Sequence, residues 1–147
     1  MISLDQKDKD ILDLIIEDSK LSHQQIAEKI NSSQASVWRR IKALEDMEVI
    51  TGYGAKVNHE KLGFEMVAFA MITLNRHSRD TVGKFETAMQ MSKAVLECHS
   101  ITGQADYILK IQAHTIRQYE FFLNDELFRT PGVEHVQTSI SLRPVKS

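Results

Sequence analysis

Apolar residues recur with the spacing of an α-helix in three separate stretches of the first 50 residues. The first stretch begins near Leu4, and the second follows Ser22 and Gln25, which form a capping-box pair. Asn31 ends the second stretch, because asparagine tolerates the left-handed backbone of a tight turn. Ser33 is a favourable N-cap for the third. A short helix, a tight turn and an amphipathic helix together predict a helix–turn–helix motif.

Beyond residue 50 the pattern changes to strands that alternate with helices. Residues 50–57 hold β-forming residues around two glycines and predict a strand or wing. Further strands are expected over residues 66–74, 95–101, 107–113 and 133–142, and helices over residues 81–91 and 115–130. The order β-α-β-β-α-β is that of the split, ferredoxin-like unit. The sequence therefore predicts an α+β fold with an N-terminal winged helix–turn–helix domain (1–50), a connecting strand or linker (51–62) and a C-terminal ferredoxin-like βαββαβ domain (63–147).

The strand predicted over residues 66–74 is apolar on both of its faces. Val67, Phe69 and Met71 lie on one face, and the alternate residues, equally apolar, lie on the other. The two helices of a β-α-β-β-α-β unit cover only one face of the sheet. Because a large exposed apolar patch marks an interface or a liability, we expect the open face to pack against a second subunit in a homodimer.

The composition of the 147-residue chain is that of a globular protein, with 42 % hydrophobic and 26 % charged residues. Its longest nearly apolar run is much shorter than the roughly 20 residues that a membrane-spanning helix needs, so no membrane association is expected. Cys98 is the single cysteine, so no intrachain disulfide forms, and a reducing cytoplasm is the expected compartment. The six histidines are scattered without metal-ligand spacing, and neither a phosphate-binding glycine loop nor a nucleophile elbow occurs. We therefore expect no metal, no cofactor and no catalytic residue.

The first 50 residues carry seven lysines and arginines against ten acidic residues, a net charge of −3. DNA binding by this domain therefore needs a concentrated basic patch, and the third predicted helix has one. When its apolar residues face the core, an advance of about 100° per residue places Arg39 and Lys42 on the outward face and Arg40 at its flank.

This outward face is interpreted as that of a recognition helix. Arg39 can read guanine edges or clamp phosphate, while Arg40 and Lys42 neutralise the charge of the DNA backbone. The start of the helix favours phosphate, and its small residues let the backbone approach DNA. The alternative is an ordinary solvated helix face, but the helix–turn–helix context favours binding to double-stranded DNA. The predicted DNA-binding residues are Ser33, Gln34, Ser36, Arg39, Arg40 and Lys42.

Two further side chains are expected to serve packing. Trp38 is predicted at the edge of the buried face of the third helix. Cys98 is predicted to be a small buried hydrophobic residue rather than a nucleophile.

Residues along almost the whole chain resemble the leucine-responsive regulatory protein / asparagine regulator (Lrp/AsnC) family. In the first half the matching residues are 4–8, 11 and 12, then Ser33, Val37, Arg40, Ile41, Leu44 and Glu45, and then Ile50, Gly52, Tyr53 and Asn58. In the second half they are residues 72–74, 97–99, Gly103, Asp106, Tyr107 and 131–133.

The resemblance implies a DNA-binding transcriptional regulator that responds to a small amino-acid effector. Members of this family form dimers through the sheet face, and many assemble further into octamers of four dimers. Their effectors bind between neighbouring dimers, beside a Gly-Asp-x-Asp-Tyr turn. The effector-binding residues that the resemblance implies here are Ser100, Gly103, Gln104, Ala105, Asp106 and Tyr107.

The turn departs from the family pattern at Gln104, where the family often has aspartate. Asp106 remains to pair with an effector's ammonium group, and backbone amides near Gly103 can hold its carboxylate. The loss of one negative charge favours a neutral amino acid, such as an apolar one, over a basic one. Without the resemblance, residues 103–106 would be interpreted as a plain hairpin turn.

Two other functions stay open at this point. One is an architectural DNA-binding protein that binds DNA broadly and has no effector. The other is an enzyme, because a few relatives resemble this family in fold but act as haem-pathway decarboxylases. The basic third helix argues against the enzyme.

Overall fold

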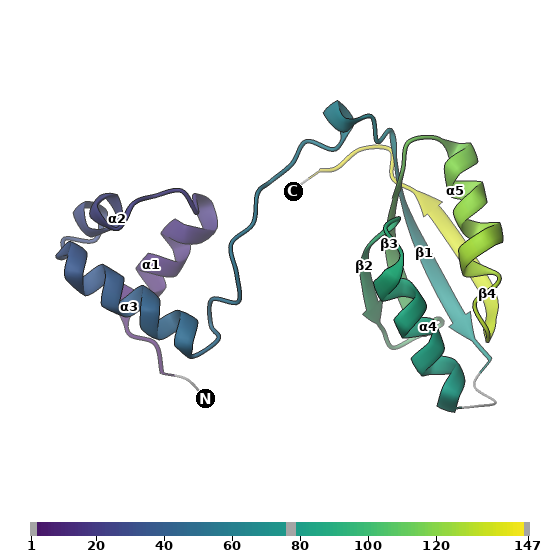
Figure 1. Cartoon of the computed structure of the whole chain (residues 1–147), viewed down its shortest axis with the longest axis horizontal. Helices are drawn as coiled ribbons and strands as arrows, with labels where there is room; N and C mark the ends of the chain where they lie inside the picture. The colour runs from purple at the N-terminus through teal and green to yellow at the C-terminus, as the bar shows by residue number, and fades with distance from the viewer. Residues whose placement is uncertain (1–2, 76–78, 146–147) are drawn as a thin grey trace. The chain divides into compact units, whose positions relative to one another are not determined.

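The structure is a computed structural model that describes residues 3–75 and 79–145 of the chain (Figure 1). The chain forms two compact units that divide between Val57 and Asn58, inside the segment expected to be the linker. Within the described residues no helix is long and apolar enough to cross a membrane.

The N-terminal unit is built from three helices, α1 (Gln6–Glu17), α2 (His23–Lys29) and α3 (Gln34–Asp46). Each begins at a side-chain cap, since Asp5, Ser22 and Ser33 accept the backbone N–H of the residue three positions later. Asn31, between α2 and α3, has a φ of +48°, as expected for the tight turn. The apolar stripes of the helices meet in one core of Ile11, Ile26, Ala27, Val37, Ile41 and Leu44. The predicted helix–turn–helix motif is therefore confirmed.

The strand or wing expected over residues 50–57 is not formed within the chain, where residues 51–57 have an irregular backbone. A strand requires backbone hydrogen bonds to a neighbouring strand. The described part of the N-terminal unit consists of helices and irregular segments, so it offers no strand to pair with. Alternating β-forming residues alone could not reveal that this partner is absent.

The C-terminal unit is a four-stranded antiparallel sheet with its two α-helices on one face (Figure 1). Its strands and helices are β1 (Met66–Leu74), α4 (Arg79–Met91), β2 (Val95–Ser100), β3 (Tyr107–Ala113), α5 (Ile116–Phe122) and β4 (Val133–Ile140). A 3-10 turn, η1 (Glu60–Leu62), precedes β1, and a π-helical turn, η2 (Leu123–Leu127), continues α5. The strand order β2-β3-β1-β4 and the element order confirm the predicted ferredoxin-like unit.

The central strand β1 has one covered face and one open face. Its alternate residues from Met66 to Leu74 are buried in a core that includes Phe85 of α4 and Phe122 of α5. On the other face Phe69 leaves 39 % of its surface exposed. Within one chain, therefore, β1 is buried on one side only, although its sequence is apolar on both.

Cys98 is exposed, so the prediction that it is a buried hydrophobic residue is wrong. The reason is that β2 lies at the edge of the sheet, with β3 on one side only. Most residues of β2 are exposed for the same reason. The apolar pattern of the neighbouring residues did not distinguish an edge strand from a central one.

Gly132, at the entry to β4, is expected to tolerate no side chain. Its φ is +89°, and a Cβ atom built there would collide with Cγ2 of Thr81. We predict that Gly132→Ala destabilises the fold by about 2–4 kcal/mol, because left-handed strain adds to overpacking. Gly83 in α4 has open space where a Cβ atom would lie, with nothing within 4 Å, so Gly83→Ala should instead stabilise the fold by roughly 1 kcal/mol. Calorimetric melting of both variants at one protein concentration tests this, and equal melting temperatures would contradict it.

Candidate nucleic-acid interface and ligand turn

Packing of the N-terminal core determines which face of α3 meets solvent. Val37, Ile41 and Leu44 are buried against α1 and α2. The opposite positions, which include Arg39 and Lys42, are exposed. The helix therefore presents the outward face that its 3.6-residue period predicts.

The start of α3 is a capped helix N-terminus. The Ser33 hydroxyl accepts the backbone N–H of Ser36 at 3.2 Å, and Gln34 is exposed in the first turn. The remaining unpaired N–H groups and the helix dipole make such a terminus favourable for a phosphate group. These three predicted residues thus lie together at one end of the exposed face.

The two cations on the outward face, Arg39 and Lys42, differ in whether they form an ion pair. Arg39 has no ion pair among the residues that the structure describes. The ammonium of Lys42 lies 2.7 Å from Asp46 one turn later, and this hydrogen bond raises the pKa of Lys42. Because that pair is on the surface, water or a phosphate oxygen can readily replace the carboxylate.

Arg40 is held in a different way. Its Nη1 atom lies 2.8 Å from Oδ2 of Asp5 and 2.6 Å from Oδ1 of Asp8, and its side chain is only 28 % exposed. The hydrogen bonds to Asp8 and Asp5 raise the pKa of Arg40. The pKa of Asp5 is lowered, first by the backbone N–H of Asp8 and also by Arg40. Arg40, the third cation predicted to bind DNA, is therefore already paired with two carboxylates at the start of α1.

Trp38 is 57 % exposed, whereas a packing role was predicted for it. Val37 and Ile41 already fill the space under α3, so a side chain about 100° further round the helix lies outside it. The indole borders a shallow groove of about 330 Å³, together with Ile15 and Tyr53. The amphipathic pattern alone gave no signal for this exposed aromatic side chain.

The predicted effector-binding residues come together where β2 connects to β3. Gly103 has a φ of +128°, which glycine adopts without strain, and Gln104 beside it is exposed. The backbone N–H of Asp106 donates to the carbonyl of Ile72 at 2.9 Å, and its Oδ2 accepts the N–H of Leu74 at 2.8 Å. Asp106 therefore ties this turn to the end of β1, a role that the sequence alone did not indicate.

Tyr107 and Ser100 flank the turn as paired residues of β3 and β2. The Tyr107 ring is buried on the helix-covered face, and its hydroxyl donates to Oε1 of Glu86 at 2.6 Å. Burial, together with this bond to a carboxylate, raises the pKa of Tyr107 to about 12. Tyr107 therefore contributes to the core and to the contact with α4, while Ser100 is exposed.

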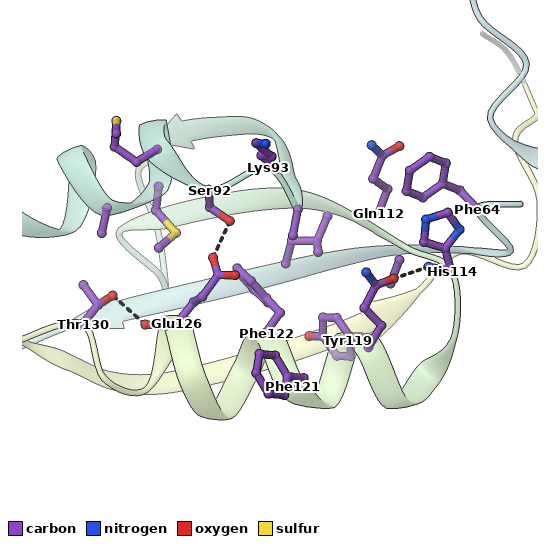
Figure 2. A pocket seen from close by; sticks show the side chains of 17 residues that line it. Phe64, Ser92, Lys93, Gln112, His114, Tyr119, Phe121, Phe122, Glu126 and Thr130 are labelled. Atoms are coloured by element: carbon purple, nitrogen blue, oxygen red, sulfur yellow. Dashed lines mark hydrogen bonds between the residues drawn. The ribbon is translucent and has the colours of Figure 1, made fainter. Parts of the chain in front are cut away.

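A groove of about 760 Å³ lies between the end of α4 and α5, and Figure 2 shows its lining. The Ser92 hydroxyl donates to Oε2 of Glu126 at 2.6 Å across this groove. At its other end the rings of Phe64 and His114 stack with centroids 4.0 Å apart. These side chains hold the helices, β3 and the segment before β1 together. Sequence reasoning predicted nothing here, and the described residues contain no cluster of three or more potential metal ligands.

Comparison with known families and curated proteins agrees with both halves of the chain. Residues 4–51 match a winged helix–turn–helix DNA-binding model, and residues 67–147 match the Lrp/AsnC ligand binding domain. The chain is 34 % identical to the proline dehydrogenase transcriptional activator of Rhizobium radiobacter, over 97 % of this chain and 92 % of the relative. It is 32 % identical to the leucine-responsive regulatory protein of Escherichia coli K12, over 97 % and 87 %. The first relative is named as a transcriptional activator and the second as a regulatory protein.

Solved structures extend the similarity to the whole fold. A transcriptional regulator from Neisseria meningitidis, in complex with L-Met, matches with a TM-score of 0.95 and 27 % identity over 99 % of this chain and 94 % of that one. An AsnC family transcriptional regulator from Agrobacterium tumefaciens matches with a TM-score of 0.92 and 25 % identity, over 98 % and 94 %. Both halves of the chain are therefore found together in regulators of known structure.

Proposed function

Since this chain belongs to the Lrp/AsnC family of DNA-binding transcriptional regulators, whose second domain binds amino acids, we propose that α3 is its recognition helix. The observation that carries this assignment is the exposure of Arg39 and Lys42 opposite the buried face of α3. Arg39 reads guanine edges or clamps phosphate, and Lys42 exchanges Asp46 for phosphate. Ser33, Gln34 and Ser36 receive a phosphate at the helix start.

The regulator that we propose acts by binding rather than by catalysis. It works in the cytoplasm, a reducing compartment that suits its exposed free cysteine, Cys98. Its curated relatives are named as a transcriptional activator in Rhizobium radiobacter and as a regulatory protein in Escherichia coli, which favours this function over the decarboxylase-like alternative.

Removal of the two outward cations should separate base reading from phosphate binding. Arg39→Ala should cost about 1–3 kcal/mol of binding energy for a selected operator and relax sequence preference, if Arg39 contacts a base. Lys42→Ala should weaken operator and non-specific DNA alike and reduce the salt dependence of binding. Fluorescence anisotropy at several salt concentrations measures both effects. Lys84→Ala, at an exposed position of α4, is the matched control and should change neither. Unchanged operator affinity in an Arg39/Lys42 double variant would refute the assignment.

We further propose that the open face of the sheet joins two subunits, and that dimers assemble into the octamer common in this family. Val67, Phe69 and Met71 of β1 lie on this face beside Ile108 of β3, and the chain itself leaves them partly exposed. Burial of such apolar surface is worth about 25 cal/mol per Å².

A lysine on this face should break the dimer. Phe69→Lys would place a desolvated charge at the centre of the interface, so its mass by light scattering should fall to that of a monomer. Phe121→Lys introduces the same change at an exposed position of α5 and should remain at least dimeric. A monomeric parent protein at micromolar concentration would contradict the proposed dimer.

The amino-acid effector is proposed to bind at the turn formed by residues 101–106, between dimers. Backbone amides around Gly103 suit its carboxylate, and the carboxylate of Asp106 supplies negative charge for its ammonium group. The proposed ligand is neutral and apolar, because Gln104 carries no charge and a related regulator binds L-Met. Asp106→Ala would also remove the bond to Leu74, so Gln104 is the position that tests ligand choice without loosening the fold.

Gln104→Asp should move ligand preference toward a basic amino acid. Calorimetry with L-methionine and L-lysine should show tighter binding of L-methionine to the parent chain. The variant should gain roughly fivefold for L-lysine relative to L-methionine, from one partly exposed ion pair. Gln24→Asp on α2 is the control and should leave the preference unchanged. If none of the twenty amino acids binds the parent chain, the architectural alternative is favoured instead.

A further inference from the structure

Arg40 joins the first turn of α1 to the flank of α3 through a small hydrogen-bonded cluster, here called the Asp5–Asp8–Arg40 clamp. Asp5 and Asp8 form the capping box of α1: the N–H of Asp8 donates to Oδ1 of Asp5 at 2.9 Å, and the N–H of Asp5 donates to Oδ2 of Asp8 at 3.1 Å. The remaining oxygen of each carboxylate accepts from Nη1 of Arg40, at 2.8 Å and 2.6 Å. Each of the four carboxylate oxygens thus has a hydrogen bond inside the clamp.

This arrangement leaves little positive charge for DNA. One guanidinium faces two carboxylates, so the clamp has a net charge of −1. Charge-assisted hydrogen bonds are roughly twice as strong as neutral ones, and Asp8 is largely shielded from water, with 17 % of its side chain exposed. By contrast, the exposed Lys42–Asp46 pair on the same helix involves only one carboxylate.

The clamp also restrains the orientation of α3 relative to α1. Arg40 is adjacent to Arg39, and its partners lie more than 30 positions away in the sequence, at the start of a different helix. Burial of the apolar stripe of α3 holds the helix on the core, but this interaction is non-directional and so opposes a small roll of the helix about its own axis less than a hydrogen bond does. A bond from its flank to α1 opposes that roll, and a roll changes where Arg39 and Lys42 point.

We propose that Arg40 is a positioning residue, which holds α3 against α1 in the orientation that recognises DNA and does not itself contact DNA. This inference rests on the proposed role of α3 as the recognition helix. It differs from the simpler prediction that Arg40 neutralises a phosphate, and the two predict opposite effects when the carboxylates are neutralised.

The decisive variant is Asp5→Asn/Asp8→Asn in the full-length chain. Asparagine caps a helix about as well as aspartate, so the start of α1 is retained. If Arg40 instead contacted a phosphate and the carboxylates held it back, this variant would release the Arg40 guanidinium and remove two negative charges. It would then bind DNA more tightly than the parent chain. If Arg40 positions α3, the variant binds its operator more weakly although it is less acidic.

The measurement is fluorescence anisotropy with an operator selected by the parent protein and with a non-specific duplex, at several salt concentrations and well below each variant's melting temperature. For both Asp5→Asn/Asp8→Asn and Arg40→Met we expect operator binding on the order of tenfold weaker. The ratio of operator to non-specific affinity should fall, and the slope of log affinity against log salt should stay at the parent value. Simple destabilisation of a chain that is still folded would leave that ratio unchanged.

Asp46→Asn is the matched control, because it removes one negative charge from α3 itself and releases Lys42. Its DNA binding should be unchanged or tighter. Tighter operator binding by the Asp5/Asp8 variant, or a salt slope lowered by about one in Arg40→Met, would overturn the proposal.

The variants of the outward face separate a failure of the clamp from a failure of the proposed function. If Arg39→Ala and Lys42→Ala leave DNA binding unchanged, then the recognition-helix assignment itself has failed. If those two weaken binding while the Asp5/Asp8 variant tightens it, only the clamp has failed. Should Arg40→Met not fold, the Asp5/Asp8 variant alone decides by the sign of its effect.

Discussion

Two helices can cover only one face of a four-stranded sheet, and the organisation of the C-terminal unit follows from this constraint. The alternate residues of β1 from Met66 to Leu74 complete the core beneath α4 and α5. Val67, Phe69 and Met71 of the same strand are apolar too, and they remain partly exposed. A small domain buries a smaller share of its unfolded surface than a large one, so a second subunit is an efficient way to remove that surface from water. The proposed dimer thus follows from a fold in which two helices cover one face of the sheet and leave the other face open.

In the N-terminal unit the corresponding problem is electrostatic. A domain with a net charge of −3 over its first 50 residues must present positive charge to DNA. The structure separates the charges by location: Arg39 and Lys42 are exposed on one face of α3, while Asp5 and Asp8 face Arg40 at its flank. The proposed clamp thereby uses one cation to hold two carboxylates in place and leaves the outward face to the other two. The local distribution of charge, rather than the total, makes DNA binding possible.

Features encoded by local sequence were predicted well. The caps Ser22 and Ser33, the left-handed Asn31 and the alternation along β3 depend on neighbours within a few residues, and the structure contains them all. Features that depend on distant residues were missed. The partners of Arg40 lie more than 30 positions away, and the bond from Asp106 to Leu74 also spans 32 positions. Hydrophobic periodicity carries no information about such pairs, and it did not show that residues 51–57 lack a strand to pair with.

The position of the turn relative to β1 offers a short physical route from effector to assembly. Asp106 bonds to the backbone of Ile72 and, through its carboxylate, to that of Leu74, so the turn and the end of β1 move together. Met71 and Thr73, which alternate with those residues, lie on the open face proposed to join subunits. A ligand bound at the proposed site would therefore act on a strand whose other face belongs to the proposed interface. Such a ligand can shift the proposed assembly only by the difference between its affinities for the assembled and separate states. DNA binding would shift in turn, because the proposed assembly sets how many recognition helices act together.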